Sequence, residues 1–245
     1  ASDPNPNAAS TRMVEKVRAL TSDVPHVAIC CDAGKSFRAG IDPEYKAQRP
    51  AGDATLFHQI DVALETLRGD GFPIWRVPGF EADDLIASAS RRYPDAAVTI
   101  VSSDKDLLQL VELNVTVFSI ASGKLYDAAA VKDKLGVDPN QVIDWLSLVG
   151  DQADNIRGAK GIGPKKAAEL LTKYGNLEDV YRDLTEHGTN FTPTLATALR
   201  EFEPRLAGVR QLVTLRFDVP LPFDHIYRER VPEDAVFSGD DEAMP

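Results

Sequence analysis

The chain has 245 residues, of which 43% are hydrophobic and 27% are charged, as is usual for a soluble globular protein. No apolar run approaches the roughly 20 residues of a membrane-spanning helix, and no secretory signal pattern is present, so we expect an intracellular protein. The net charge of −11 argues at first sight against a polyanionic partner. Cys30 and Cys31 are adjacent in an apolar run, which predicts small core residues rather than a disulfide framework.

The first half of the chain alternates helix and strand patterns. The first ten residues are turn-forming types and predict disorder, whereas Met13, Val17 and Leu20 predict a helix over 11–20. We expect the run at 26–31 to be a strand buried on both faces. Further strand candidates lie at 72–77, 96–102 and 114–120, with helix patterns at about 53–68, 81–92 and 104–112. This alternation predicts an α/β fold with a mainly parallel central sheet.

After about residue 127 helix patterns dominate. They cover 127–136, 139–150, 163–175, 176–184 and about 190–216, and the polar tail at 238–245 is expected to fray. Glycines at 158, 161 and 163 precede Pro164, a residue that suits the first turn of a helix. Exposed amides at that helix N-terminus, with Lys160, Lys165 and Lys166 close by, predict a phosphate-binding element.

Carboxylates recur in three short clusters, each beside an apolar segment. In parallel sheets, ligands bind beyond the carboxyl ends of the strands, so we expect these acids at one sheet edge. Close like charges need protons or cations to neutralise them, and hard divalent ions prefer oxygen ligands. The candidate metal ligands are Asp32, Glu81, Asp83, Asp84, Asp104, Asp106, Asp151 and Asp154. These eight account for most of the excess of 38 acidic over 27 basic residues, so the charge does not exclude nucleic acid.

Five segments of the chain resemble the structure-specific 5′ nucleases, a family that includes flap endonucleases, phage 5′ exonucleases and the 5′-nuclease domain of bacterial DNA polymerase I. They are the FR and PEYKAQR of 37–49, GFEADDL at 79–85, VSSDKDLLQL at 101–110, the glycine-rich 150–167 and LVTLRFDVPL at 212–221. The likeness is greatest to the bacterial and phage branch. It implies a PIN-like α/β nuclease core over 1–126 with a helical arch at about 38–60. A helical DNA-binding region would follow over 127–245, with a helix–hairpin–helix-type element at about 150–174.

The resemblance also implies roles for individual residues. Asp32, Glu81, Asp83, Asp84 and Asp104 match the first metal cluster of the family, and Asp106, Asp151 and Asp154 match the second. Lys46 and Arg49 match a catalytic basic pair that contacts the scissile phosphate, and Tyr45 would stack on a nucleobase. The duplex-gripping residues would be Lys160, Gly161, Gly163, Lys165 and Lys166. The implied cofactors are two or more Mg²⁺ or Mn²⁺ ions, with K⁺ at the glycine-rich element.

The implied function is divalent-metal-dependent 5′–3′ exonuclease and flap endonuclease activity in DNA replication and repair. We expect a nucleoid-associated monomer that binds DNA 5′ ends or flaps and works with a DNA polymerase. One feature departs from the family, because nothing before residue 26 resembles its first strand, which ends in a metal-binding Asp. We expect truncation rather than true loss. Two alternatives stay open: a catalytically impaired junction-binding homologue, and a PIN-like ribonuclease, which would generally lack the basic arch and the glycine-rich element.

Overall fold

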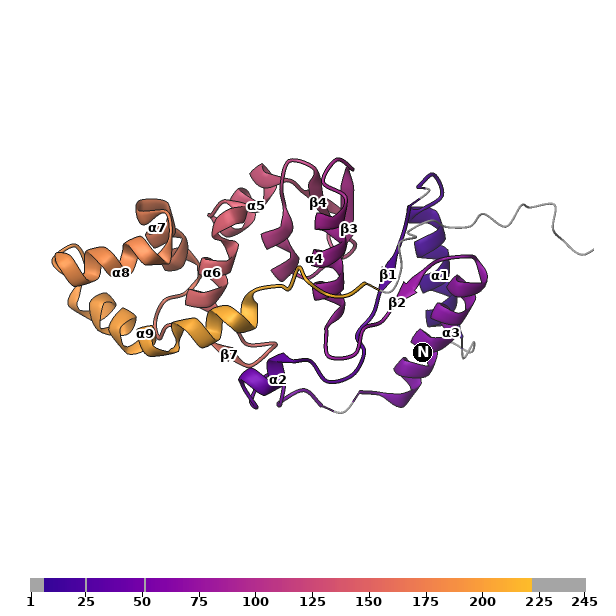
Figure 1. The fold of residues 1–245 in the computed structure, drawn as a ribbon, viewed down its shortest axis with the longest axis horizontal. Coiled ribbons are helices and arrows are strands. Elements are labelled where there is room, and N and C mark those ends of the chain that lie inside the picture. Colours follow the sequence, from indigo (N-terminus) through magenta and orange to yellow (C-terminus); the bar gives the residue numbers. More distant parts are fainter. Residues whose placement is uncertain (1–6, 25, 51, 222–245) are drawn as a thin grey trace, which may run out of the picture. The chain divides into compact units, whose positions relative to one another are not determined.

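The computed structural model describes residues 7–24, 26–50 and 52–221 (Figure 1). The chain divides into two compact units, the first made of residues 1–31, 51–76 and 222–245, and the second of 32–50 and 77–221. Among the described residues, no helix combines the length and the apolar character that a bilayer crossing requires. The polar tail predicted at 238–245 lies outside the described residues.

The first unit pairs two helices with a short parallel sheet. Helices α1 (Ala8–Leu20) and α3 (Ala54–Gly69) pack together around a core of Val14, Ala63, Leu67 and Phe72. Strands β1 (Ile29–Cys30) and β2 (Ile74–Trp75) are parallel. The predicted helix over 11–20 is confirmed but begins at Ala8, so the disorder predicted for the first ten residues is wrong for residues 8–10.

Strand β1 differs from its prediction in length and burial. It is two residues long and half-buried, because its parallel pairing with β2 covers only Ile29 and Cys30. A strand buried on both faces is therefore not found, and both cysteines are half-buried rather than core residues.

The second unit contains a mixed three-stranded sheet. Strand β3 (Val98–Val101) is parallel to β4 (Val115–Ser119), and β4 is antiparallel to β5 (Lys124–Tyr126). Helix α4 (Ala82–Arg92) precedes β3, and the 3-10 helix η1 (Asp106–Leu110) replaces the longer helix expected over 104–112. Parallel pairing is confirmed for β1–β2 and for β3–β4, but within the described residues these are two separate sheets.

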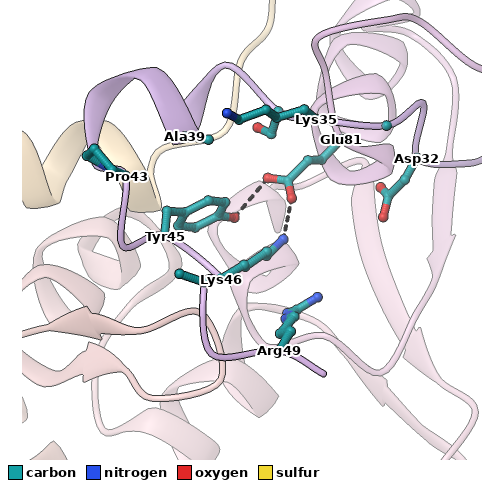
Figure 2. Close-up of a pocket in the computed structure, with 11 residues that line it drawn as sticks. Asp32, Lys35, Ala39, Pro43, Tyr45, Lys46, Arg49 and Glu81 are labelled. Atoms are coloured by element: carbon teal, nitrogen blue, oxygen red, sulfur yellow. Dashed lines mark hydrogen bonds and ion pairs between the residues drawn. The ribbon is translucent and has the colours of Figure 1, made fainter. Parts of the chain in front are cut away.

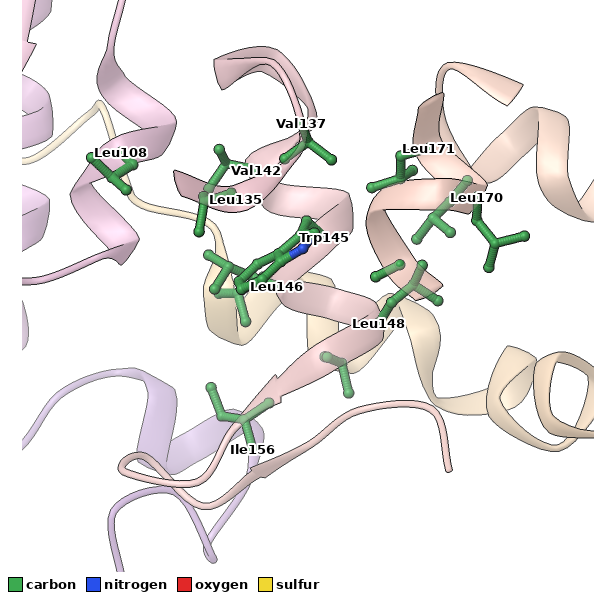
Figure 3. Packing of buried hydrophobic residues seen from close by; sticks show 14 of the residues in the cluster. Leu108, Leu135, Val137, Val142, Trp145, Leu146, Leu148, Ile156, Leu170 and Leu171 are labelled. Atoms are coloured by element: carbon green, nitrogen blue, oxygen red, sulfur yellow. The ribbon is translucent and has the colours of Figure 1, made fainter. Parts of the chain in front are cut away.

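The C-terminal helices all form where their patterns predict them. They are α5 (Ala128–Leu135), the 3-10 helix η2 (Pro139–Gln141), α6 (Val142–Val149), α7 (Pro164–Tyr174), α8 (Leu177–Glu186) and α9 (Pro193–Val213). Helix α6 is the apolar centre, with Trp145, Leu146 and Leu148 buried in the same core as Leu170 and Leu171 of α7 (Figure 3). This core gives the loops around α6 a rigid base.

A tight hairpin follows α6 and carries two of the candidate ligands. Strands β6 (Gly150–Asp151) and β7 (Ile156–Arg157) pair in an antiparallel ladder. A Cβ on Gly158 would lie 2.2 Å from the Leu148 carbonyl oxygen, and one on Gly150 would lie 2.4 Å from the Gly158 nitrogen. Backbone therefore packs directly on backbone here, which fixes the hairpin and its acidic turn to the end of α6.

The helical arch expected at about 38–60 stays a prediction, and the described residues of this range are only partly helical. Helix α2 (Arg38–Ile41) is a single turn, residues 43–48 form turns, and α3 begins only at Ala54. The physical reason is local, because Pro43 and the left-handed Lys46 (φ 55°) interrupt helical geometry. Residues 44–49 instead contact the hairpin that carries Asp151 and Asp154.

Candidate active site

The segment 42–49 is tied to the β6–β7 turn by backbone hydrogen bonds. The Lys46 N–H donates to the Asp154 carbonyl oxygen at 2.9 Å, and the Asn155 side chain donates to the Glu44 carbonyl oxygen at 2.8 Å. Lys46 and Asn155 both have left-handed backbones, with φ of 55° and 59°. Such conformations cost on the order of 1 kcal/mol each and persist where the surroundings dictate them. The position of the Lys46 side chain is thus imposed by the fold.

Two basic side chains of this segment meet two candidate ligands. Lys46 Nζ is hydrogen-bonded to Glu81 Oε1 (Figure 2). The same nitrogen lies 3.6 Å from Asp154 Oδ2. Arg49 Nη2 lies 2.5 Å from Asp154 Oδ1. The structure therefore brings together the basic pair and one member of each predicted carboxylate cluster, although Glu81 and Asp154 are far apart in the sequence.

Tyr45 lies beneath these ion pairs. Its hydroxyl is 2.8 Å from Glu81 Oε2 and 3.1 Å from Asp154 Oδ2, as Figure 2 shows for Glu81. Only 8% of the residue is exposed. Burial, followed by the charges of Glu81 and Asp154, raises the pKa of Tyr45, so the phenol stays protonated and donates. Stacking on a nucleobase stays a prediction, and the buried ring does not support it.

A pocket of about 410 Å³ opens beside this network. Its charged lining consists of Asp32, Lys35, Lys46, Arg49 and Glu81 (Figure 2). Lys35 was not singled out from the sequence, where it is one of many lysines with no motif around it. The pocket thus combines three cations with two carboxylates, a lining suited to a phosphate group held beside metal ions.

Asp83 is the focus of the first carboxylate cluster. Burial raises the pKa of Asp83 to about 7, and the neighbouring charges of Asp104, Asp106, Asp32 and Glu81 add to the rise. Helix α4 positions this cluster, because Asp83 lies in its first turn and Asp32 Oδ1 accepts the Ala82 N–H at 2.8 Å. Asp83 therefore feels the charges of other candidate ligands, and their convergence into one metal site stays a prediction.

The second cluster surrounds Lys105. Burial raises the pKa of Asp106 to about 7, with Asp104, Asp151 and Asp154 adding to the rise and Lys105 opposing it. Burial would also raise the pKa of Asp151, but the hydrogen bond and charge of Lys105 and the backbone N–H groups of Ala153 and Asp154 together lower it. Asp106 Oδ1 is buried and accepts no hydrogen bond within the described part of the chain. An unsatisfied carboxylate oxygen among other acids is what a bound cation would satisfy.

The donor set fits a hard divalent cation, because it consists only of carboxylate oxygens. Within the described residues, however, no three or more His, Cys, Asp or Glu side chains are already grouped as a ligand cage. Several of the acids are instead held by cations, namely Glu81 and Asp154 by Lys46, and Asp151 by Lys105. The site therefore has the right chemistry, but side chains must move, and the lysines must release their partners, before the acids can surround an ion.

Asp84 differs from the other candidate ligands. It is fully buried, and Arg38 donates two hydrogen bonds to it, at 2.7 and 2.8 Å. Arg38 is itself buried, although no local pattern around FRAG predicts this. Asp84 thus lies behind the cluster, whereas Asp83 faces it.

The glycine-rich element forms the turn before α7. Ala159 and Ile162 are buried anchors, Gly161 has φ of 77°, and Pro164 opens the helix as predicted. The side chains of Lys160, Lys165 and Lys166 are exposed, and Lys166 Nζ donates to the Gly161 carbonyl oxygen at 3.1 Å. The geometry is that of an exposed helix N-terminus flanked by lysines, and its role in DNA binding stays a prediction.

Comparison with known families decides what this arrangement belongs to. Residues 2–136 match the family described as 5′-3′ exonuclease, N-terminal resolvase-like domain, and residues 137–234 match 5′-3′ exonuclease, C-terminal SAM fold. The chain belongs to the 5′-3′ exonuclease family. The family assignment and the combination of an α/β core with a C-terminal helical region, both predicted from the sequence, are confirmed.

Curated relatives of this family member include free-standing exonucleases and polymerases. It is 35% identical over 206 residues to a 5′-3′ exonuclease of Mycoplasma pneumoniae, covering 81% of this chain and 69% of that protein. It is 41% identical over 151 residues to a 5′-3′ exonuclease of Aquifex aeolicus, covering 61% of this chain and 52% of that protein. The match to DNA polymerase I of Rhizobium leguminosarum is 39% identical over 208 residues and covers 81% of this chain and 20% of that polymerase. The chain thus spans about half of the Aquifex exonuclease and a fifth of that polymerase.

Solved structures give the same assignment for the fold. A bacteriophage T5 flap endonuclease in complex with DNA and metal ions superposes with a TM-score of 0.73 at 27% identity, covering 85% of this chain and 83% of that one. The T5 5′-exonuclease with bound zinc gives a TM-score of 0.73 at 27% identity, covering 86% of this chain and 82% of that one. This family member therefore has the fold of proteins that were crystallised with divalent metals.

Proposed function

We propose that this 5′-3′ exonuclease family member is a divalent-metal-dependent nuclease that hydrolyses phosphodiester bonds near DNA 5′ ends and flaps. One observation carries the proposal. At the pocket wall, Lys46 and Arg49 contact Glu81 and Asp154, so cations suited to a phosphate and acids suited to a metal ion lie within a few ångströms. A site that must hold both a phosphate and its activating metals needs this juxtaposition.

The metal ions would be held by two groups of carboxylates. Asp32, Glu81, Asp83 and Asp104 would form the first group, and Asp106, Asp151 and Asp154 the second. Bound Mg²⁺ or Mn²⁺ would supply an activated water and charge stabilisation for in-line displacement at phosphorus. The raised pKa of Asp83 and of Asp106, both about 7, supports this assignment, because clustered acids gain most from a bound cation.

The chain's own cations and phenol would position the substrate and the ligands. Lys46, Arg49 and Lys35 line the pocket and would offset the negative charge of the phosphate. Tyr45 would hold the Glu81 and Asp154 carboxylates through its hydroxyl and would not stack on a base.

The glycine-rich element would bind the duplex away from the reacting phosphate. The amides at the start of α7, with Lys160, Lys165 and Lys166, would contact backbone phosphates, and Gly161 and Gly163 would allow their close approach. Carbonyl oxygens of this turn would hold K⁺. Such binding would be independent of sequence and would weaken as salt rises. We further propose a monomer that acts on DNA in the cytoplasm together with a DNA polymerase, as the fused arrangement of the polymerase relatives suggests.

Cleavage of a labelled 5′-flap duplex tests the proposal. Mg²⁺ or Mn²⁺ should support release of the flap, and excess chelator should stop it. Asp104→Ala and Asp151→Ala should abolish cleavage while leaving the Kd for DNA largely unchanged. Asp138→Asn is the matched control, because that aspartate pairs with Lys132 and caps η2, and it is not a candidate metal ligand.

The outcomes separate the competing functions. Binding of the flap without cleavage by the wild-type chain would favour an impaired junction-binding homologue. Preferential cleavage of the equivalent RNA would favour a PIN-like ribonuclease. Unchanged cleavage by both Asp104→Ala and Asp151→Ala would contradict the site assignment.

A further inference from the structure

Asp84 has no oxygen lone pair left for a metal ion. Its Oδ1 accepts hydrogen bonds from Arg38 Nη2 at 2.8 Å and from the Arg216 N–H at 3.0 Å. Its Oδ2 accepts from Arg38 Nη1 at 2.7 Å and from the Glu81 N–H at 3.2 Å. An ionised carboxylate offers about four acceptor sites, and here all four are used at a fully buried position. A cation could bind Asp84 only by displacing the guanidinium.

The hydrogen-bond donors of the Arg38 guanidinium are likewise all used. Besides the two bonds to Asp84, its Nη1 donates to Glu81 Oε2 at 2.9 Å. Its Nε donates to the Leu212 carbonyl oxygen at 2.8 Å and its Nη2 to the Thr214 carbonyl oxygen at 3.1 Å. A guanidinium has five N–H donors, and each has an acceptor. The side chain is therefore a buried junction between α2, the start of α4 and the end of α9.

The end of α9 and the segment that follows it complete this junction, and we call residues 212–219 the C-terminal strap. Ser88 of α4 accepts the Val219 N–H at 3.1 Å and donates to the Arg216 carbonyl oxygen at 3.2 Å. Gln109 of η1 accepts the Leu215 N–H at 3.1 Å and donates to the Val213 carbonyl oxygen at 3.0 Å. The strap thus binds α4, which carries Asp83, and η1, which carries Asp106, and these contacts give a role to the motif LVTLRFDVPL.

We propose that Arg38 and Asp84 are a pair of positioning residues, and that Asp84 is not a metal ligand. The pair fixes the first turn of α4 against the C-terminal strap, so that Glu81 and Asp83 face the metal site. This inference rests on the proposed metal-dependent function. It reassigns one carboxylate of the first cluster, and it predicts that the end of α9 influences cleavage without contacting substrate.

Mn²⁺ binding to the metal-free full chain, measured by calorimetry and electron paramagnetic resonance, tests the assignment of Asp84. Asp84→Asn should bind as many ions as the wild type with Kd values within about threefold, whereas Asp83→Asn should lose at least about tenfold in affinity. Flap cleavage by Asp84→Asn should fall about 10- to 100-fold. A loss of Mn²⁺ affinity in Asp84→Asn equal to that in Asp83→Asn would overturn the proposal.

The double variant Arg38→Gln, Asp84→Asn distinguishes a positioning role of Asp84 from a role as metal ligand. The two roles predict changes in cleavage of opposite sign. Arg38→Gln alone leaves a buried, unpaired Asp84, so adding Asp84→Asn should raise both the melting temperature and the cleavage rate above those of Arg38→Gln. If Asp84 were a ligand, the second substitution would lower cleavage further. If Arg38→Gln does not fold, the Mn²⁺ affinity of the double variant is compared with that of the wild type instead.

Mn²⁺ binding and flap cleavage, measured together, separate this inference from the proposed function. A wild-type chain that binds Mn²⁺ but does not cut flap DNA would refute the nuclease function and leave the comparison of Asp83 and Asp84 valid. A wild-type chain that binds no Mn²⁺ would overturn both.

Discussion

The Lys105 ammonium lies 2.5 Å from Asp151 Oδ2, inside a cluster of acids otherwise suited to a metal ion. The same nitrogen lies 3.7 Å from Asp106 Oδ1, an oxygen without a hydrogen-bond donor in the described part of the chain. Lys105 therefore supplies part of the positive charge that the second cluster needs. A divalent ion and this lysine would compete for Asp151.

Lys105→Met should lower the stability of the metal-free protein and raise its affinity for Mn²⁺. Loss of the partly exposed ion pair should reduce the free energy of unfolding by about 1 kcal/mol. Removing the competing cation should lower the Kd for Mn²⁺ at the second cluster, as measured by calorimetry. Lys132→Met, which breaks an exposed pair with Asp138, is the matched control and should change neither quantity. Weaker Mn²⁺ binding by Lys105→Met would contradict the competition.

The metal-free protein should become less stable as pH rises towards 7. The folded-state pKa of Asp83 is about 7, against an ordinary value of 3.8, because of burial and neighbouring acids. Its protonated form stabilises the fold fully below pH 4, and this stabilisation is lost as pH rises through about 7. Asp83→Asn cannot ionise, so its melting temperature should depend less on pH over this interval.

Thermal melts in chelator from pH 4 to 8 measure this difference between wild type and Asp83→Asn. Saturating Mg²⁺ at pH 7.5 should raise the wild-type melting temperature, since an ion at about 100 times its Kd adds about 2.7 kcal/mol. Parallel pH curves for the two proteins would show that Asp83 is not the titrating group.

Tyr45→Phe should impair cleavage although it keeps the aromatic ring. The variant loses the hydroxyl contacts with Glu81 and Asp154, which should cost about 1 kcal/mol of stability. With these carboxylates less firmly held, kcat should fall about tenfold. If Tyr45 acted by stacking on a nucleobase, phenylalanine would substitute for it and kcat would be unchanged. Single-turnover cleavage of flap DNA distinguishes the two results.

Gly158→Ala should destabilise the β6–β7 hairpin. The added Cβ would lie 2.2 Å from the Leu148 carbonyl oxygen, which belongs to the backbone and cannot move aside. We expect a loss of about 2–3 kcal/mol in the free energy of unfolding. Gly163→Ala is the matched control, because its Cβ would meet nothing within 4 Å and should change stability by less than about 0.5 kcal/mol. Equal urea midpoints for the two variants would contradict the close backbone packing.

The sequence alone was enough to predict the family, the α/β core and the C-terminal helices. Helix periodicity, caps and proline positions are local properties, and so the helices from α5 to α9 form where their patterns lie. The acidic clusters were also readable, because each is a contiguous motif. Local patterns did not give strand length and pairing, and β1 is shorter and less buried than its apolar run indicates.

The role of each side chain within the site was decided only by tertiary contacts. Asp83 and Asp84 are adjacent in the sequence, yet one faces other acids and the other is enclosed by Arg38. Arg38 reaches its partners from 43 to 176 residues away, and Tyr45 reaches Asp154 across 109 residues. Such pairings depend on how the strap and the hairpin pack against α4 and the 42–49 segment. No local pattern encodes that packing, because it follows from burial of the whole core.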